Sequence, residues 1–284
     1  MRLLSFELNG RRGLALKSAS EWLDLGESDP SLPDDVAALL ALEDWRRRVD
    51  VAAAKAPRMD VSAIEFLPPV RRGEKILCVG LNYLAHVGES PYSVPDYPIF
   101  FPRFASGLIG HRAPMIRPPE SEALDYEVEL AVIIGKAGRR IAASAALDHV
   151  AGYTIMNEGS VRDYQFKSPQ WTMGKNFDGT AGCGPWFVSA DELPPGGRGL
   201  TIETRVNDVV EQSASTSDML FDVATLISLA SAVLTLRPGD MIATGTPAGV
   251  RFGKKPPVYL KPGDVCSLSI EGIGTLENTV RDEF

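Results

Sequence analysis

The stretch Leu124–Lys136 reads LDYEVELAVIIGK, and it decides how the chain is interpreted. It places Glu127 and Glu129 two residues apart, directly before the apolar run Leu130–Ile134. Successive side chains of a β-strand point to opposite faces, so residues i and i+2 share one face. A strand here sets two carboxylates side by side at the edge of a core. Because burying like charges is costly unless a positive group pairs with them, the stretch predicts a cation beside the glutamates.

A third carboxylate, Glu158, follows the strand-like run Ala151–Ile155 at the point where that strand should break. Three carboxylates form an all-oxygen set that suits a hard divalent cation, chiefly Mg²⁺, Mn²⁺ or Ca²⁺. No cluster of cysteine and histidine competes for zinc, because the three histidines are scattered. The alternative is an E-x-E pair on a solvated strand face. Wide separation of the three groups, or pairing with arginine and lysine in place of an ion, would argue against the metal.

Composition narrows the class of protein. The chain has 284 residues, a hydrophobic fraction of 44%, a formal net charge of −8 and three isolated cysteines. The acidic balance argues against a nucleic-acid or anionic-membrane partner. No apolar run reaches the roughly 18 residues of a membrane span, and no signal-peptide core opens the chain. The odd cysteine count indicates a reducing compartment, so we expect a cytoplasmic protein.

The first 70 residues differ from the rest in the secondary structure that they predict. Asn9-Gly10 lies between two strand-like runs and predicts a hairpin. Ser31 predicts a helix start, and Val36–Ala54 predicts one or two helices. From residue 71 onward, short β-rich runs alternate with Gly/Pro turns, and Leu220–Leu236 is the clearest helix. We therefore expect a small α+β N-terminal domain (1–70) and a larger domain (71–284), in a chain of α+β class that is mainly β.

The second region contains seven sequence blocks in the order that a known family has. It resembles the fumarylacetoacetate hydrolase family over nearly all of Arg71–Glu283, in the branch of acylpyruvate hydrolases and 2-hydroxyhepta-2,4-diene-1,7-dioate isomerases. The blocks that carry the resemblance are GLNYLAHVGE (Gly80–Glu89), DYEVELAVIIGK (Asp125–Lys136), GYTIMNEGSVRDYQ (Gly152–Gln165), WTMGKNFDG (Trp171–Gly179), TSDMLFDVATLIS (Thr216–Ser228), LRPGDMIATGTPAGV (Leu236–Val250) and LKPGDVCSLSIEGIGTLENTV (Leu260–Val280).

The resemblance implies a mixed β-roll or β-sandwich core, a Mg²⁺ or Mn²⁺ cofactor and a homodimer. It places the metal ligands at Glu127, Glu129 and Glu158. The third ligand departs from the pattern, because the family usually has aspartate there and glutamate is one methylene longer. Arg103 replaces a lysine that is usual in the family, and we expect it to contact substrate with a forked guanidinium.

Two groups of side chains have roles that the resemblance implies. His86 and Glu89 are three apart, so on a helical turn Glu89 can orient the imidazole for proton transfer. By spacing alone this pair is more typical of surface residues without a catalytic role. Ser90–Pro98 resembles the lid that carries it. The other group holds substrate beside the metal: Arg162, Gln165, Lys175 and Thr246. Read without the resemblance, Arg162 could be a surface ion pair, Lys175 a solvated residue and the Thr246 loop a tight turn.

These expectations converge on a hydrolase that cleaves a C–C bond in a 2,4-dioxo acid, giving a 2-oxo acid and a carboxylic acid. The substrate is of the acylpyruvate, fumarylpyruvate or diketo-deoxy sugar acid type. One alternative is a decarboxylase or keto–enol isomerase of 2-oxo-hexene- or heptadiene-dioates in aromatic catabolism. Another is a non-catalytic protein that binds metal and oxo acid. The lid and the N-terminal region, where the resemblance is thinnest, should set the substrate's distal group.

Overall fold

Strand β11 (Val128–Ile134) contains the apolar run, so the predicted strand is confirmed. In the computed structural model, which describes residues 1–284, every residue of β11 is buried. The even-numbered side chains of β11 belong to one apolar cluster, whereas Ala131 and Ile133 belong to a second. Glu127 and Glu129 share the odd-numbered side, so the alternation of the strand sets both carboxylates on one face, as predicted.

A twelve-stranded sheet is built outward from β11. On one side β11 pairs with β12 (Val150–Asn157), which pairs with β14 (Ala181–Ser189), which pairs with β1 (Arg2–Leu8). On the other side it pairs with β17 (Met241–Ala243), followed by β6 (Ile76–Gly80) and β7 (Ile99–Pro102). The N-terminal strands therefore extend the sheet that carries the glutamates, and their apolar side chains share a cluster with those of β12 and β14.

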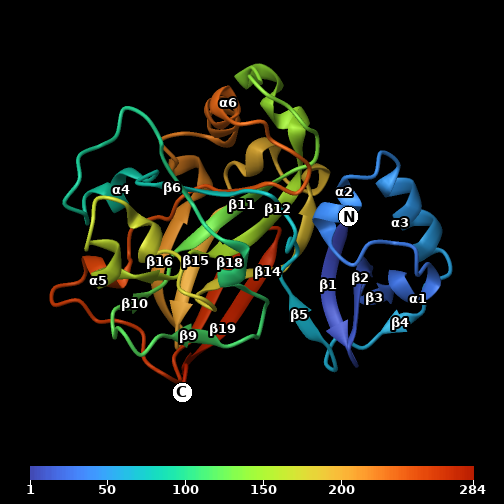
Figure 1. Cartoon of the computed structure of the whole chain (residues 1–284), viewed down its shortest axis with the longest axis horizontal. Coiled ribbons are helices and arrows are strands. Elements are labelled where there is room, and N and C mark those ends of the chain that lie inside the picture. The colour runs from blue at the N-terminus through green and yellow to red at the C-terminus, as the bar shows by residue number, and fades with distance from the viewer.

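The N-terminal elements form a block at one end of this sheet (Figure 1). The predicted hairpin is confirmed: Asn9 and Gly10, both at positive φ, turn β1 into β2. The predicted helix start at Ser31 is wrong, because Asp35 caps the helix by accepting hydrogen bonds from the Ala37 and Ala38 amides. The elements of the block are β2 (Arg11–Ser18), β3 (Glu21–Asp24), α1 (Leu25–Ser28), α2 (Val36–Leu40), α3 (Trp45–Ala53), β4 (Arg58–Met59) and β5 (Glu65–Leu67). The division at residue 70 stays a prediction.

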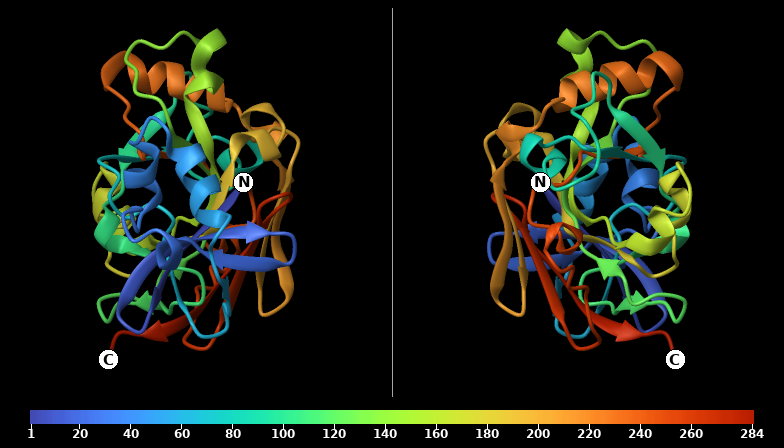
Figure 2. Two further views of the ribbon diagram at one scale, coloured as in Figure 1. Left: turned by 90° about the vertical axis from the view of Figure 1, so that its right-hand side faces the viewer. Right: turned by 90° about the vertical axis from the view of Figure 1, so that its left-hand side faces the viewer.

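A second, five-stranded sheet packs against the even-numbered face of β11. Its order is β16 (Val209–Ser215), β15 (Thr201–Val206), β18 (Val265–Ile270), β19 (Gly274–Asp282) and β9 (Met115–Arg117). Helix α6 (Val223–Val233) lies across one end of the molecule beside the turn at residues 143–149 (Figures 1 and 2). The remaining short elements are α4 (Leu84–Val87), β8 (Leu108–Ile109), β10 (Leu124–Asp125), β13 (Ser160–Val161) and α5 (Arg162–Gln165). Two sheets with few helices confirm the predicted mainly β, α+β class. No helix has the length and apolar character that a membrane crossing needs.

Candidate active site

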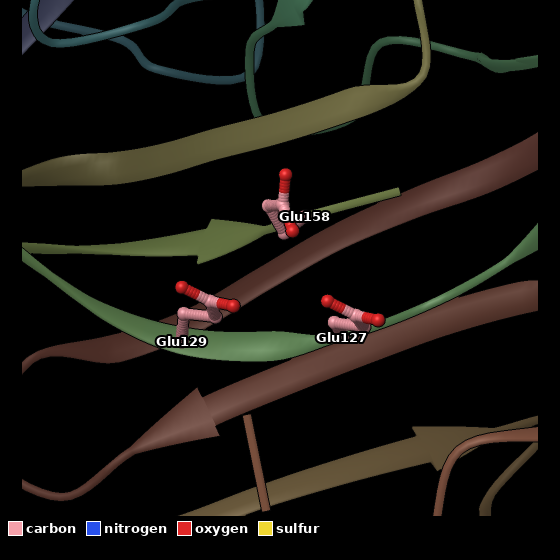
Figure 3. Close-up of side chains that lie close together, drawn as sticks. All are labelled: Glu127, Glu129 and Glu158. Atoms are coloured by element: carbon pink, nitrogen blue, oxygen red, sulfur yellow. The ribbon is translucent and has the colours of Figure 1, made fainter. Parts of the chain in front are cut away.

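Three buried glutamates meet where β11 and β12 diverge (Figure 3). Glu127 and Glu129 point from one strand toward Glu158, and carboxylate oxygens of the three lie within 4.8 Å of one another. Backbone hydrogen bonds fix this approach: the Glu158 amide donates to the Glu127 carbonyl at 2.9 Å. The Glu127 amide in turn donates to Asn157 Oδ1 at 3.0 Å. The predicted constellation of three carboxylates is therefore present.

Cationic side chains also contact two of these glutamates. Lys175 Nζ lies 2.8 Å from Glu127 Oε2 and 2.6 Å from Glu158 Oε2. Arg162 Nη1 lies 2.6 Å from Glu127 Oε1, and Arg103 Nη1 lies 3.0 Å from Glu158 Oε1. Pairing with lysine and arginine is the observation that argues against a metal, and it is found at Glu127 and Glu158.

The charges do not balance, and Glu129 is the group left over. Four buried carboxylates, the three glutamates and Asp125, face three cations, because Arg162 also pairs with Asp125 at 2.9 Å. Glu129 has no cationic partner and accepts only the Gly245 amide, at 2.9 Å. Burial raises the pKa of Glu129 well above its ordinary value, and the charges of Glu158 and Glu127 raise it further. A carboxylate so placed fits one added cation, and the all-oxygen donor set fits a hard divalent ion.

The contacts among Glu127, Glu158 and Lys175 shift the pKa of each of these groups. Burial would raise the pKa of Glu127, but the charges of Lys175 and Arg162 hold it well below its ordinary value. Burial raises the pKa of Glu158, and Lys175 opposes that rise. Burial would lower the pKa of Lys175, yet Glu127 and Glu158 hold it above its ordinary value. Lys175 is therefore a buried ammonium that can donate hydrogen bonds but cannot serve as a base near neutral pH.

A small cavity opens onto the glutamates, with a free volume of about 30 Å³. It brings together eight of the predicted site residues: His86, Glu127, Glu129, Glu158, Arg162, Gln165, Lys175 and Thr246. An aromatic wall that sequence reasoning missed completes it: Tyr92, Phe101, Phe166, Trp171 and Phe252. These residues come from four separate segments of the chain. Taken singly, each is typical of an aromatic side chain in a core or a loop, so they were not predicted to form one wall. The tight, aromatic-walled space suits a small substrate.

The predicted His–Glu pair lies at the cavity mouth. His86, in α4, has its Nδ1 atom 3.4 Å from Glu89 Oε2. Glu89 does not line the cavity; its carboxylate accepts the Gly249 amide at 2.9 and 3.1 Å. This arrangement leaves His86 Nε2 free for proton transfer. In the predicted lid segment, Tyr92 faces the cavity, and its hydroxyl accepts a hydrogen bond from Trp171 Nε1 at 3.2 Å.

Arg162 and Gln165 also line the cavity. Arg162 is held by Asp125 through Nε at 2.9 Å and by Gln165 through Nη1 at 2.9 Å. Its buried Nη2 atom has no partner in the protein. An unpaired guanidinium N–H beside the cavity is suited to a carboxylate. Asp125 also accepts the amides of Arg251 and Phe252, so it anchors Arg162 and the 251–252 turn together.

Arg103 corrects the prediction of a substrate contact. Its side chain is completely buried behind Glu158 and does not line the cavity. It donates to Glu158 Oε1 at 3.0 Å, to the Gly159 carbonyl at 3.1 Å and to Thr180 Oγ1 at 2.8 Å. The arginine side chain is longer than the lysine usual in the family and ends in a fork, so it bridges these three acceptors and holds Glu158 in place.

Known proteins resemble the chain over its whole length. A profile described as "Fumarylacetoacetate (FAA) hydrolase C-terminal" matches residues 75–281. The human protein named "Oxaloacetate tautomerase FAHD2A, mitochondrial" is 40% identical over 99% of this chain and 91% of its own length. The structure of a fumarylacetoacetate hydrolase from Exiguobacterium antarcticum is 38% identical, with a TM-score of 0.88 and full coverage of both chains. That of maleylpyruvate hydrolase from Sphingobium sp. SYK-6, in complex with manganese(II) and pyruvate, is 29% identical, with a TM-score of 0.81 over 99% of each chain.

Proposed function

The chain belongs to the fumarylacetoacetate hydrolase family, and on that premise we propose that it is a divalent-metal-dependent keto–enol tautomerase of oxaloacetate. The observation that carries the proposal is the cavity itself. It brings one free imidazole nitrogen, on His86, together with hydrogen-bond donors on Arg162 and Lys175. A proton can therefore leave carbon while charge on oxygen is stabilised, which is what tautomerisation requires. The name of the human relative supports oxaloacetate as the substrate.

Glu127, Glu129 and Glu158 would hold Mg²⁺ or Mn²⁺. When bound, such an ion polarises the 2-oxo group and stabilises negative charge on its oxygen. Arg162 Nη2 and the Thr246 hydroxyl bind a substrate carboxylate through hydrogen bonds. Lys175 uses two of its three N–H donors on Glu127 and Glu158. The third is available for the oxygen on C2 of the substrate.

His86 performs the proton transfer in this proposal. In the keto form, His86 Nε2 removes a proton from C3, the C–H electron pair forms the C2–C3 double bond, and the C2 carbonyl pair moves onto oxygen. The imidazolium then gives its proton to that oxygen, which returns His86 to its neutral form. In the reverse direction C3 receives the proton from His86. Glu89 stabilises the imidazolium that forms between the two steps. No carbon–carbon bond breaks and no water is consumed.

The proposal is tested by following the ultraviolet absorbance of enol-oxaloacetate as it decays to the keto form. Purified protein with Mg²⁺ or Mn²⁺ should accelerate the decay, and prior treatment with EDTA should remove the acceleration. The enzyme should release neither CO₂ nor pyruvate. Tight binding of oxalate without turnover of any oxo acid would instead indicate the non-catalytic protein considered above.

A second candidate is the predicted hydrolysis of a 2,4-dioxo acid, with His86 activating water. The observation that favours it is the likeness to maleylpyruvate hydrolase. A panel of acylpyruvates, fumarylpyruvate and maleylpyruvate, with the products identified by mass, separates the two reactions. Formation of a 2-oxo acid and a second carboxylic acid would support hydrolysis, and unchanged dioxo acids alongside fast oxaloacetate tautomerisation would support the first candidate.

We also propose that the chain forms a homodimer and works in the cytoplasm. The three isolated cysteines, which suit a reducing compartment, motivate the location, and the family resemblance motivates the dimer. Light scattering should give a mass near twice the 30.7 kDa of the chain. The mitochondrial location in the human relative's name is a property of that protein. Fractionation of the source cells tests the location here.

A further inference from the structure

Gln212 links the five-stranded sheet to the cavity without lining it. It lies on β16, is 1% exposed, and all four of its amide hydrogen bonds are made. Its Oε1 accepts from the Val128 amide at 3.1 Å and from Thr204 Oγ1 at 2.8 Å. Its Nε2 donates to the Pro247 carbonyl at 2.7 Å and to Thr246 Oγ1 at 2.8 Å.

The backbone partners fix the orientation of this amide. The Val128 amide can only donate and the Pro247 carbonyl can only accept, so exchanging Oε1 and Nε2 would create two repulsive contacts. The Thr246 hydroxyl, facing Nε2, must therefore accept from it. No protein group receives the hydroxyl's own hydrogen, and Thr246 lines the cavity. That hydrogen is consequently left for a ligand oxygen.

The same amide also holds the strand that carries the glutamates. Val128 lies between Glu127 and Glu129, and its backbone amide donates to the side chain of Gln212. We propose that Gln212 is a positioning residue: it commits the Thr246 hydroxyl to donate its hydrogen into the cavity, toward a carboxylate oxygen of the substrate. The identity of that oxygen rests on the proposed oxo-acid function. The direction of the hydroxyl rests only on the contacts of Gln212.

A double-mutant cycle separates this role from simple structural support. In Gln212→Glu the side chain keeps its size but becomes an acceptor, so the Thr246 hydroxyl turns to donate to it and the cavity loses a donor. A hydrogen bond to a charged group of about 1.5–3 kcal/mol corresponds to a rise in KM for oxaloacetate of about 10-fold or more. Since binding is lost in ground and transition state alike, kcat should change little. In a Thr246→Val background, Gln212→Glu should raise KM no further.

Thr204→Val is the matched control, because it removes another buried hydrogen bond to the same amide without turning the Thr246 hydroxyl. It should lower the melting temperature and leave KM within about twofold. An unchanged KM in Gln212→Glu, or KM effects that multiply in the double variant, would overturn the role. If Gln212→Glu does not fold, the cycle is repeated with Gln212→Met, which removes the amide that fixes the Thr246 hydroxyl without offering a strong acceptor, so KM should rise by a smaller factor and again not rise further in the Thr246→Val background.

The dissociation constant of oxalate, measured by calorimetry on the Mn²⁺-loaded protein, is the readout that does not need turnover. If oxalate affinity follows the same non-additive pattern while oxaloacetate is not tautomerised, the proposed function is wrong and the role of Gln212 holds. If oxaloacetate is tautomerised but neither KM nor oxalate affinity responds to Gln212→Glu, the proposed function holds and the role of Gln212 is wrong.

Discussion

Glu129→Gln removes the one buried carboxylate that has no cationic partner. Glu129 is 1% exposed, and its single protein partner is the Gly245 amide. A glutamine of the same size can keep that bond through its own Oε1 atom. The substitution therefore deletes a charge while the packing stays intact. We expect the metal-free variant to be more stable than the metal-free wild type, although the variant should lose the metal.

The size of the gain follows from the cost of an uncompensated charge. Neutralising a buried, unpaired carboxylate is worth on the order of 2 kcal/mol in the free energy of unfolding. At about 2.1 cal/mol/K per residue, a chain of 284 residues has an unfolding entropy near 0.6 kcal/mol/K. In EDTA the variant should therefore melt about 3 °C above the wild type. With saturating Mn²⁺ the order should reverse, because only the wild type gains stability from binding.

The pH dependence gives the same prediction a second readout. Burial, followed by the charges of Glu158 and Glu127, raises the pKa of Glu129 in the folded protein above its ordinary value of 4.5. The folded state then binds this proton more tightly than the unfolded state. The contribution of Glu129 to the free energy of unfolding is complete below pH 4.5 and is lost as pH rises through the folded pKa. The metal-free wild type should show that decline, and Glu129→Gln should lack it.

Differential scanning calorimetry in EDTA and in Mn²⁺ measures all three effects. Glu120→Gln is the control, because it makes the same chemical change at an exposed position without an ion pair. If metal-free Glu129→Gln melts below the wild type, the charge of Glu129 is already compensated within the protein, and the reasoning from charge balance is refuted.

Three further perturbations test other parts of the site and fold. His86→Ala should abolish tautomerisation while Mn²⁺ still binds; activity above one tenth of wild type would show that another group transfers the proton. Lys175→Met leaves Glu127 and Glu158 without their shared partner and should destabilise the metal-free protein by about 3–5 kcal/mol. In Mn²⁺ the loss of stability should be smaller. A drop in the urea midpoint from wild type to variant that is equal with and without metal would contradict this. Burial, and next the charge of Arg112, lower the pKa of His111 to about 4 from 6.5. The unfolded chain therefore binds this proton first, and stability should fall as pH drops from about 6.5 to 4; a melting temperature that falls as steeply in His111→Gln would exclude His111 as a cause.

Local patterns were enough to predict the elements that bring the glutamates together. Alternation in β11 and the break after β12 predicted that Glu127, Glu129 and Glu158 converge, because these relations depend on strand geometry and one hydrogen-bonded pair of strands. The hairpin at Asn9-Gly10 was predictable for the same reason. The three-residue spacing of His86 and Glu89 likewise predicted their contact.

Features that depend on distant packing were not predictable. Strand β14 was missed because Gly182, Gly184 and Pro185 read as a loop; Pro185 is tolerated there because the pairing with β12 shifts register between Tyr153 and Ile155. Arg103 was expected in the cavity, and only the fold places it behind Glu158. The part played by Gln212 depends on how the second sheet meets β11, which one sequence does not contain.

Titration of metal-depleted protein with Mn²⁺, with bound metal and tautomerase activity measured on the same samples, tests the central claim most directly. Bound Mn²⁺ and activity on enol-oxaloacetate should rise together and level off at one ion per chain. Glu127→Gln, Glu129→Gln and Glu158→Gln should each remove both signals. Full activity in the depleted protein, or a bound ion that survives all three substitutions, would contradict the claim that these glutamates hold the metal on which catalysis depends.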